Sequence, residues 1–432
     1  MKKQFIFILC GLFLCAGTIA ATDYNVLQQG AVGDGKTLNT KSLQSAIDAL
    51  HAKGGGQLYF PAGRYLTGSL QLKSNVTLYL EKEAVLLGST SPYDYPGFST
   101  EKELKVNNDH FDQALIYAEG AENIGITGEG CIDGQGRELA LTIDSLHHTG
   151  ELVDKHYNTY RKRPNTRPKL LFMRNCRKVE LRKTDFRSGA AWGLSFSLCT
   201  DLTIDSLHVE NRAYWNNDGI DISDCKDVRI SNCFINSADD GICLKSHNRG
   251  AWNDRVSISN CHIISSASAI KFGTESLGGF KNVTIDNIRV KDTFRSAIAI
   301  ESVDGAEIEN VKLENIEIVC PGRATRGMAY MSVSRLKDVP ENEKGYPEFT
   351  MFEELPSWGF YVRHVKGIQM HNIKLRLQED DFRPAFVFDR VSDVRLSGIS
   401  LPENKKEGQV VLRQTNLQSA DNAVKEYITE VE

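Results

Sequence analysis

The chain has 432 residues, of which 41% are hydrophobic and 25% are charged, and its formal net charge is −5. This composition is that of a soluble globular protein with a large core, and it excludes a disordered or fibrous chain. The negative charge argues against a nucleic-acid or anionic-membrane partner, because both favour a basic surface. An acidic substrate is still allowed, since a local cationic cleft can bind it.

The N-terminus has the pattern of a secretory signal peptide. Lys2 and Lys3 give a positive start, and the apolar run from Phe5 to Leu14 is too short to span a membrane. Small residues precede a cleavage point after Ala20. We therefore expect residues 1–20 to be removed and residues 21–432 to form one exported domain, periplasmic or extracellular, with no membrane span.

The first element expected in the mature chain is a short helix over residues 40–52. Its apolar residues recur at helical spacing, and three glycines follow at 54–56. Such a helix can cap the open end of a repeating structure. Short strands with alternating apolar and polar residues are then predicted at 57–60, 65–72 and 76–80, with turns between them.

From about residue 170 the sequence repeats. A small residue followed by an apolar–any–apolar triplet recurs in steps of 26, 22, 28 and 28 residues, at Gly193, Gly219, Gly241, Ala269 and Ala297. A second strand type lies between these positions. Leucine-rich repeats need a different leucine pattern, and propeller blades are longer. The repeat therefore predicts an all-β fold, a single-stranded right-handed parallel β-helix with a short N-terminal capping helix.

Two segments depart from the repeat. Residues 321–356 interrupt it and are expected to form a long loop bordering a binding site. Residues 422–432 are expected to form a terminal helix. Eight cysteines follow residue 20 without any C-x-x-C pair, so neither a zinc nor a redox motif is indicated. Several share one repeat position and are interpreted as small buried hydrophobes, with disulfides as the alternative in an exported protein. We expect no cofactor and no metal site.

The repeat places carboxylates in a row. Asp218 and Asp240 precede equivalent glycines and should face each other across one strand spacing, about 4.8 Å, while Asp239 points differently. Two such carboxylates repel each other. A hydrolase can use the pair to hold and deprotonate a water, with the third carboxyl as the acid. The alternative is structural, since aspartates in turns cap backbone N–H groups. Outward-pointing Lys245 and Lys271 lie beside the row and favour catalysis, although a solvated surface lysine is the alternative for Lys271.

At these residues the chain resembles glycoside hydrolase family 28, the polygalacturonases and their relatives. The family's Asn-Thr-Asp-Gly motif corresponds to residues 216–219, and its Asp-Asp motif corresponds to residues 239–240. The likeness runs from about residue 25 to 400. It implies that Asp239 is the general acid, that Asp218 and Asp240 activate the water, and that Asn216 contacts the substrate. The implied reaction is inverting hydrolysis of a galacturonate-containing, pectic polysaccharide or oligosaccharide.

Two family motifs are altered in this chain. The family's Gly-His-Gly aligns with residues 267–269, where Ser268 replaces the histidine. Its Arg-Ile-Lys, which grips the galacturonate carboxylate, aligns with residues 299–301, so Glu301 stands at a substrate position in place of a cation. Lys271 is a candidate replacement for the lost cation and His247 for the lost histidine, although an ordinary loop histidine is the favoured alternative for His247. These losses keep open a rhamnogalacturonan-type hydrolase and a non-catalytic polysaccharide-binding β-helix, and more remotely a calcium-dependent lyase.

Further substrate contacts are predicted around the interrupted segment. Tyr361 and Arg363 share the outward face of one strand, and aromatic rings and arginine forks suit sugars and carboxylates. An ordinary surface strand is the alternative. Trp192 and Trp215 flank the acid row and are candidates for stacking on a sugar ring, with packing at a turn as an equally favoured alternative. The protein is expected to act as a monomer.

Overall fold

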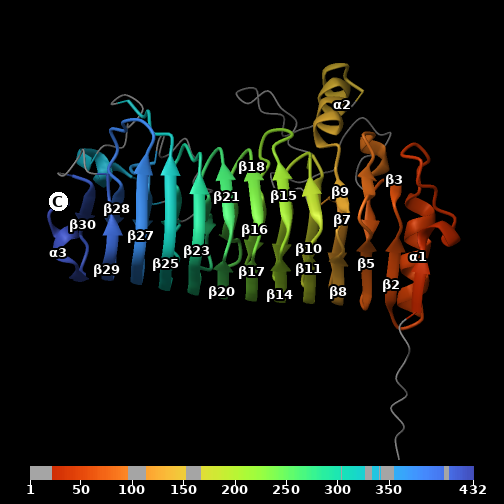
Figure 1. Cartoon of the computed structure of the whole chain (residues 1–432), viewed down its shortest axis with the longest axis horizontal. Helices are drawn as coiled ribbons and strands as arrows, with labels where there is room; N and C mark the ends of the chain where they lie inside the picture. Colours follow the sequence, from red (N-terminus) through yellow and green to blue (C-terminus); the bar gives the residue numbers. More distant parts are fainter. Residues whose placement is uncertain are drawn as a thin grey trace, which may run out of the picture.

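The computed structural model describes residues 22–95, 113–151, 167–302, 304–325, 333–339, 341, 355–402 and 408–432. The predicted signal peptide, residues 1–20, lies outside this range. Parallel strands stack in successive turns along the long axis of the molecule (Figure 1). The predicted parallel β-helix is therefore confirmed. No helix in the described part is long and apolar enough to cross a membrane.

Each regular turn contributes one strand to a twelve-stranded sheet and one or two strands to a twenty-stranded sheet, with loops between them. The strands of the twelve-stranded sheet, from the N-terminal end, are β4 (Leu70–Gln71), β7 (Ala114–Glu119), β10 (Lys169–Arg174), β13 (Leu194–Ser197), β16 (Ile220–Ser223), β19 (Ile242–Ser246), β22 (Ile270–Ser276), β24 (Ile298–Glu301), β26 (Phe360–Arg363), β28 (Phe386–Asp389), β30 (Val410–Arg413) and β32 (Ile428–Val431).

The twenty-stranded sheet bends around the other side of the core. It is made of β1 (Thr22–Asn25), β2 (Gly56–Phe60), β3 (Gly63–Thr67), β5 (Val76–Leu80), β6 (Ala84–Gly88), β8 (Glu122–Thr127), β9 (Cys131–Asp133), β11 (Arg177–Arg182), β12 (Asp185–Arg187), β14 (Thr200–Asp205), β15 (His208–Asn211), β17 (Lys226–Ser231), β18 (Phe234–Ser237), β20 (Asn253–Ser259), β21 (His262–Ser265), β23 (Phe280–Lys291), β25 (Ile308–Cys320), β27 (Val365–Leu377), β29 (Ser392–Ser400) and β31 (Leu417–Ala420).

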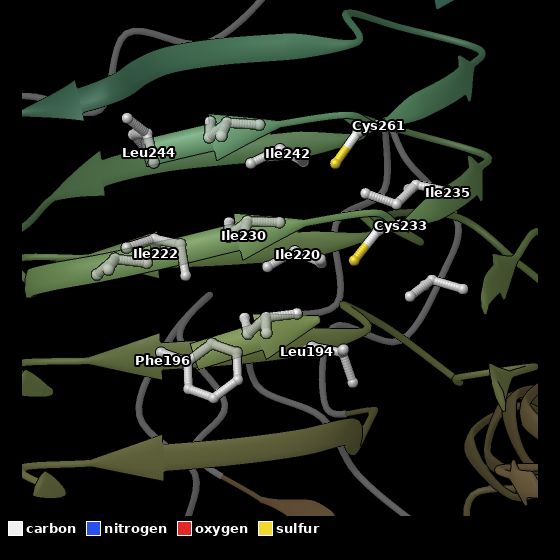
Figure 2. Packing of buried hydrophobic residues seen from close by; sticks show 14 of the residues in the cluster. Leu194, Phe196, Ile220, Ile222, Ile230, Cys233, Ile235, Ile242, Leu244 and Cys261 are labelled. Atoms are coloured by element: carbon white, nitrogen blue, oxygen red, sulfur yellow. The ribbon is translucent and has the colours of Figure 1, made fainter. Parts of the chain in front are cut away.

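The core lies inside the coil, where apolar side chains of successive turns stack on one another (Figure 2). Ile220 pairs in register with Ile242, and Ile222 pairs with Leu244; all four are fully buried. Burying each such side chain stabilises the fold by about 1.5–3 kcal/mol relative to leaving it in water. The alternation of inward and outward residues therefore fixes the register, because a slip of one residue would expose the whole apolar row.

Small residues before the strands allow the turns to stack closely. A Cβ atom added at Gly219 would lie 2.4 Å from the carbonyl oxygen of Gly241, and one added at Gly241 would lie 2.5 Å from Ile263 Cγ2. Neither distance leaves room for a carbon atom. The glycines thus bring consecutive turns into contact directly beside the predicted aspartates.

The described residues also contain helices, one of which was predicted from the sequence. The expected capping helix is α1 (Thr40–Ala52), which buries Leu43 and Ile47 at the N-terminal end of the coil (Figure 1). A second helix, α2 (Gly136–His148), was not predicted, although Leu139 and Ile143 show its helical spacing. Three short 3₁₀ helices are η1 (Val26–Gln29), η2 (Pro92–Asp94) and η3 (Val333–Asp338).

The predicted terminal helix is largely wrong. Only α3 (Asn422–Lys425) is helical, and the chain then forms β32, which pairs in parallel with β30. The exposed edge of the last turn explains the difference, since its unpaired backbone groups attract a further strand. The segment after Cys320 does leave the repeat as expected. All eight cysteines after residue 20 are buried free thiols, so the hydrophobic interpretation holds and the disulfide alternative is excluded.

Candidate active site

The turns that precede β16, β19 and β22 bring the predicted carboxylates together. The backbone N–H of Gly219 donates to the carbonyl of Asp240 at 2.9 Å, and Gly193 donates to Asp218 at 3.0 Å. Gly241 in turn donates to Ser268 at 2.9 Å. Asp218, Asp240 and Ser268 therefore occupy one position in consecutive turns. This is the register that the repeat predicted, and Ser268 stands next in the same row.

Two buried asparagines hold the turn that carries Asp218. Asn217 Nδ2 donates to the carbonyls of Gly189 and Ala191, at 2.9 and 2.6 Å. Asn211 Nδ2 donates to the carbonyl of Asp218 at 2.8 Å. Both amides are completely buried, so their loss would leave turn carbonyls unsatisfied. Asn217 lies within the motif at residues 216–219, whereas nothing in the sequence around Asn211 indicated its role.

Asp239 is held differently from its neighbour. Its carbonyl accepts hydrogen bonds from Ser237 Oγ at 2.8 Å and from Ser265 Oγ at 2.6 Å. Its side chain is 25% exposed, whereas that of Asp240 is 5% exposed. Arg295 Nη1 lies 3.9 Å from Asp239 Oδ1. Of these two carboxyls, Asp239 is therefore the one that a substrate can approach more easily.

Two buried lysines compensate the recessed carboxylates. Lys271 Nζ lies 3.4 Å from Asp240 Oδ2. Lys245 Nζ lies 3.7 Å from Asp218 Oδ2 and 3.5 Å from Asp221 Oδ1. Both lysines are buried, so the alternative of a solvated surface residue is wrong for Lys271. Buried charges that are not paired are very costly, and each lysine here has a carboxylate within ion-pair distance.

The pKa values of the aspartates are driven apart by this arrangement. Burial, with the charges of Asp221 and Asp239, raises the pKa of Asp218 well above its usual value. Burial and the charge of Asp240 also raise the pKa of Asp239. Burial opposes ionisation of Asp240 as well, but Lys271 followed by Arg295 outweighs it and lowers the pKa of that carboxyl. Carboxyls with separated pKa values are the usual basis for dividing acid and base roles.

Asp221 and Arg295 are parts of the cluster to which the sequence analysis gave no role. Asp221 is fully buried, and its pKa is raised by burial, against the opposing charges of Lys245 and Lys169. Arg295 lies two residues before Ala297, the last of the repeated small residues, and reaches across to Asp239. The signal for Asp221 was its outward position on β16. Arg295 reaches the cluster from a turn with a serine at the position of the aspartates, so spacing alone did not identify it.

The two predicted tryptophans have different surroundings. Trp192 lies beneath two ammonium groups, since Lys169 Nζ and Lys245 Nζ are each 4.7 Å from its ring centroid. Trp215 is 66% exposed, and its carbonyl accepts a hydrogen bond from Arg167 Nη1 at 2.6 Å. Trp192 thus belongs to the packed floor of the site, while Trp215 presents an aromatic surface beside it.

Asn216 and His247 lie on two sides of the carboxylates. Asn216 Oδ1 accepts a hydrogen bond from Arg167 Nη2 at 3.2 Å. His247 Nε2 lies 3.2 Å from Ser223 Oγ, and its Nδ1 pairs with Glu275. His247 is therefore engaged by a carboxylate of its own, at the end of β19 away from Asp240.

Tyr361 and Arg363 are buried and do not line an open cleft. Both are fully buried beneath the segment that interrupts the repeat, and Arg363 Nη2 lies 2.6 Å from Glu341 Oε1. Both side chains point outward from β26, as predicted. The residues that cover them were not predicted, so these side chains lie neither in an open cleft nor on an ordinary surface strand. Glu301 lies on the neighbouring strand β24 and is 1% exposed. Burial raises its pKa to about 7, although the charges of Lys271 and Arg363 oppose this.

No group of three or more histidine, cysteine, aspartate or glutamate side chains in the described ranges has the geometry to hold a metal ion. The cluster is instead a set of carboxyls balanced by lysine and arginine. Such a set can hold a water on ionised oxygens and donate a proton from a neutral carboxyl. That chemistry is acid–base hydrolysis.

Comparison with known proteins agrees with this geometry. The model of glycosyl hydrolases family 28 matches residues 56–321. The chain belongs to family 28. The resemblance inferred from the aspartate motifs is thus confirmed, and with it the assignment to a family of glycoside hydrolases.

Two sequence relatives are named as a polygalacturonase and a galacturonosidase. A probable polygalacturonase of Vitis vinifera is 30% identical over 321 residues, covering 70% of this chain and 60% of the relative. An exo-poly-alpha-D-galacturonosidase of Dickeya chrysanthemi is 28% identical over 248 residues, covering 50% and 41%. The matches thus span about half of the length of these two relatives.

Solved structures of family 28 share the fold. The exopolygalacturonase of Yersinia enterocolitica superposes with a TM-score of 0.65 at 21% identity, covering 95% of this chain and 77% of that structure. The exopolygalacturonase of Thermotoga maritima gives 0.61 at 20% identity, covering 92% and 91%. These likenesses confirm the all-β, right-handed parallel β-helix.

Proposed function

We propose that this family 28 member hydrolyses a glycosidic bond in a galacturonate-containing, pectic glycan and inverts the anomeric configuration. The observation that carries the proposal is the division between the two neighbouring carboxyls at positions 239 and 240. Asp239 is the more exposed of the pair at 239–240 and has a raised pKa, while recessed Asp240 has a lowered pKa. Asp239 then protonates the leaving oxygen, and Asp240 with Asp218 holds and deprotonates the attacking water.

The lysines and Arg295 complete this mechanism. Lys271 keeps Asp240 ionised, so the base is ready near neutral pH. Arg295 lies beside Asp239 and can stabilise its carboxylate once the proton has left. Inversion requires an acid and a base about 6.5–9.5 Å apart, with room for a water between them. The names of the two sequence relatives support galacturonate as the substrate unit.

The test is product analysis on a panel of pectic oligosaccharides, with the anomeric proton followed by NMR during the first turnovers. We expect hydrolysis with inversion, and we expect Asp239→Asn and Asp240→Asn to lose it. If both variants hydrolyse every oligosaccharide in the panel as fast as the wild type, the proposed function fails. Glycan binding without products would instead support the non-catalytic alternative.

A second substrate within the same reaction class is favoured by Glu301. A carboxyl at this position disfavours a neighbouring galacturonate carboxylate and suits a hydroxyl-bearing neutral sugar. Rhamnogalacturonan-type oligosaccharides, in which galacturonate alternates with a neutral sugar, therefore belong in the panel. Faster cleavage of these than of plain oligogalacturonates would select this candidate.

We also propose that the chain is exported after removal of residues 1–20 and acts as a monomer outside the cytoplasm. The charged start, the apolar run and the small residues before position 21 support this. N-terminal sequencing of the protein recovered from the culture medium or the periplasm tests it. An intact N-terminus on active intracellular protein would contradict the proposal.

A further inference from the structure

Three consecutive turns of the coil bring a serine, a histidine and a glutamate into contact beside the aspartates. Ser223 is the last residue of β16, His247 follows directly after β19, and Glu275 belongs to β22. His247 Nε2 lies 3.2 Å from Ser223 Oγ, and its Nδ1 contacts Glu275 Oε2. The two nitrogens of one imidazole therefore face a hydroxyl and a carboxylate. Hydrolysis of the glycosidic bond by the aspartates uses none of these three side chains.

The contacts of the imidazole determine which nitrogen carries its proton. An ionised carboxylate can only accept hydrogen bonds, so Glu275 keeps the proton of a neutral His247 on Nδ1. Nε2 is then an acceptor, and the Ser223 hydroxyl is the donor. In this arrangement the histidine takes the serine proton as the hydroxyl attacks, while the carboxylate orients the ring and stabilises the imidazolium. A nucleophile, a base and an orienting carboxylate are the parts that acyl transfer requires.

A bulge in β22 helps to place the carboxylate of this group. Leu244 on β19 pairs with Phe272 on β22, but Ser246 pairs with Ser276, so the register shifts between these two pairs. The extra residues of β22 include Glu275. Bulges of this kind bend a strand and re-aim its side chains, and they are frequent next to active sites. Glu275 therefore meets the histidine at a local departure from the regular stacking.

The loop that carries His247 is held by a different residue. Buried Asp224 accepts hydrogen bonds from the backbone N–H groups of His247 and Asn248, each at 3.1 Å, and from Asn248 Nδ2 at 2.7 Å. These contacts satisfy the backbone at the end of β19 without the imidazole. The ring of His247 is thus placed by its own two contacts, as a proton-transferring group must be.

The serine lies on the same face as the aspartate cluster. Ser223 follows Asp221 by two residues on β16, so the two are about 6.6 Å apart along the strand and share the outward direction. Ser223 also pairs in register with Lys245 on β19. A positive charge on this face favours the oxyanion that forms when a serine attacks an ester. A sugar held at the aspartates would therefore bring its own substituents close to Ser223.

The exposure of the three residues limits the group that can react. The side chains of His247 and Glu275 are 24% and 13% exposed, whereas Ser223 is 3% exposed. The hydroxyl is thus reached through a narrow opening beside the histidine. An acetyl group carries only a methyl group on its carbonyl carbon and suits such an opening. The methyl ester of a galacturonate does not, because its carbonyl carbon is attached to the sugar ring.

We propose that Ser223, His247 and Glu275 form a second catalytic site, which removes O-acetyl groups from the glycan. Ser223 Oγ bonds to the acetyl carbon, the bond from that carbon to the sugar oxygen breaks, and His247 passes the serine proton to that oxygen. A water then attacks the acetyl-serine, gives its proton to His247, and releases acetate as the serine hydroxyl is restored. The choice of a pectic glycan rests on the proposed function, whereas cleavage of the ester is a separate activity.

The test measures acetate and glycosidic products in one sample of O-acetylated pectic oligosaccharide. The matched control for Ser223→Ala is Ser257→Ala, which removes a hydroxyl from β20 in the other sheet. We expect the wild type and Ser257→Ala to release acetate, and Ser223→Ala to be slower by about 10³-fold or more with unchanged glycosidic cleavage. The proposal is overturned if the wild type releases no acetate, or if Ser223→Ala releases it as fast.

The two products also separate this inference from the proposed function. Acetate without cut glycosidic bonds would mean that the proposed function fails and the second site stands. Cut bonds without acetate would mean the reverse. Methanol released from a methyl-esterified oligosaccharide as fast as acetate would contradict the choice of the acetyl group.

Covalent labelling of the wild-type protein tests the nucleophile without relying on a variant. A fluorophosphonate reacts with activated serines, so peptide mass spectrometry should find the label on Ser223. Labelling of other serines alone would contradict the assignment.

Glu275 is a positioning residue in this scheme, because it acts through His247. Glu275→Gln should lower kcat for acetate release by about 10²–10⁴-fold with KM unchanged, since an amide no longer fixes the tautomer of the ring. The same variant should slow the labelling of Ser223. Normal labelling together with a raised KM would refute this role.

Discussion

Lys245 is the residue whose removal should most clearly expose the electrostatics of the site. It is buried between Asp218 and Asp221, at 3.7 and 3.5 Å, and lies over the ring of Trp192. Lys245→Met keeps most of the side-chain volume and removes only the charge. Removing one partner of a buried ion pair typically costs about 3–5 kcal/mol while the other partner stays charged.

The carboxyls can avoid most of this cost by binding a proton, which makes the effect depend on pH. An energy of about 3 kcal/mol corresponds to about two pH units. Since Lys245 lowers the already raised pKa of Asp218, its removal should raise that pKa further. Asp218 must be ionised to hold the water, so we expect the acidic limb of the kcat/KM profile to move up by about one to two pH units.

The free energy of unfolding of Lys245→Met should also depend on pH. Below the unfolded-state pKa of an aspartate, about 3.9, the carboxyls are neutral and need no cation, so the variant should then nearly match the wild type. Its loss of unfolding free energy should grow as pH rises, and urea unfolding at pH 3 and pH 8 measures this. The matched control is Lys312→Met, which removes an exposed pair with Glu314 at 3.0 Å and should cost less than about 1 kcal/mol. An unchanged pH–rate profile with a pH-independent stability loss would refute the reasoning.

Three further predictions concern the same cluster. Asp239→Asn should lower kcat by about 10²–10⁴-fold while calorimetry shows retained glycan binding, and a loss confined to binding would contradict its role as the acid. Relative to the wild type, Asp218→Asn should gain stability as pH rises from 3 to 8 in urea unfolding. The reason is that the folded pKa of Asp218 lies above its unfolded value, so ionisation weakens the fold as pH rises. Excess chelator should leave the rate unchanged, because acid–base hydrolysis needs no metal; strong inhibition, with products that absorb in the ultraviolet, would indicate a lyase.

The sequence was sufficient for the coil and the carboxylate row because both depend on local periodicity. Small residues before apolar triplets determine how turns stack. Asp218 and Asp240 occupy equivalent positions because Gly219 and Gly241, which follow them, stack in consecutive turns. Spacing could also indicate that Lys245 and Lys271 share the outward face. It could not indicate that they are buried, because burial depends on neighbouring turns as well as on direction.

The parts that the sequence did not yield depend on contacts between distant segments. Tyr361 and Arg363 appeared to belong to an open strand because nothing in their own turn shows that Leu336 and Val339 fold back over them. Arg295 reaches Asp239 from the turn before β24, where Ser296 stands at the position that aspartates hold in the earlier turns. The helix α2 was visible as apolar spacing, but it falls within a region where strands were expected on both sides.

The stacking of the aspartates has a consequence for how such enzymes diversify. Because Asp218, Asp240 and Ser268 occupy one position in consecutive turns, the spacing of side chains along this face can change only by whole turns, in steps of about 4.8 Å. Insertion of one complete turn of 22–28 residues after β22 would move all later turns by one such step while leaving each acid in its own turn.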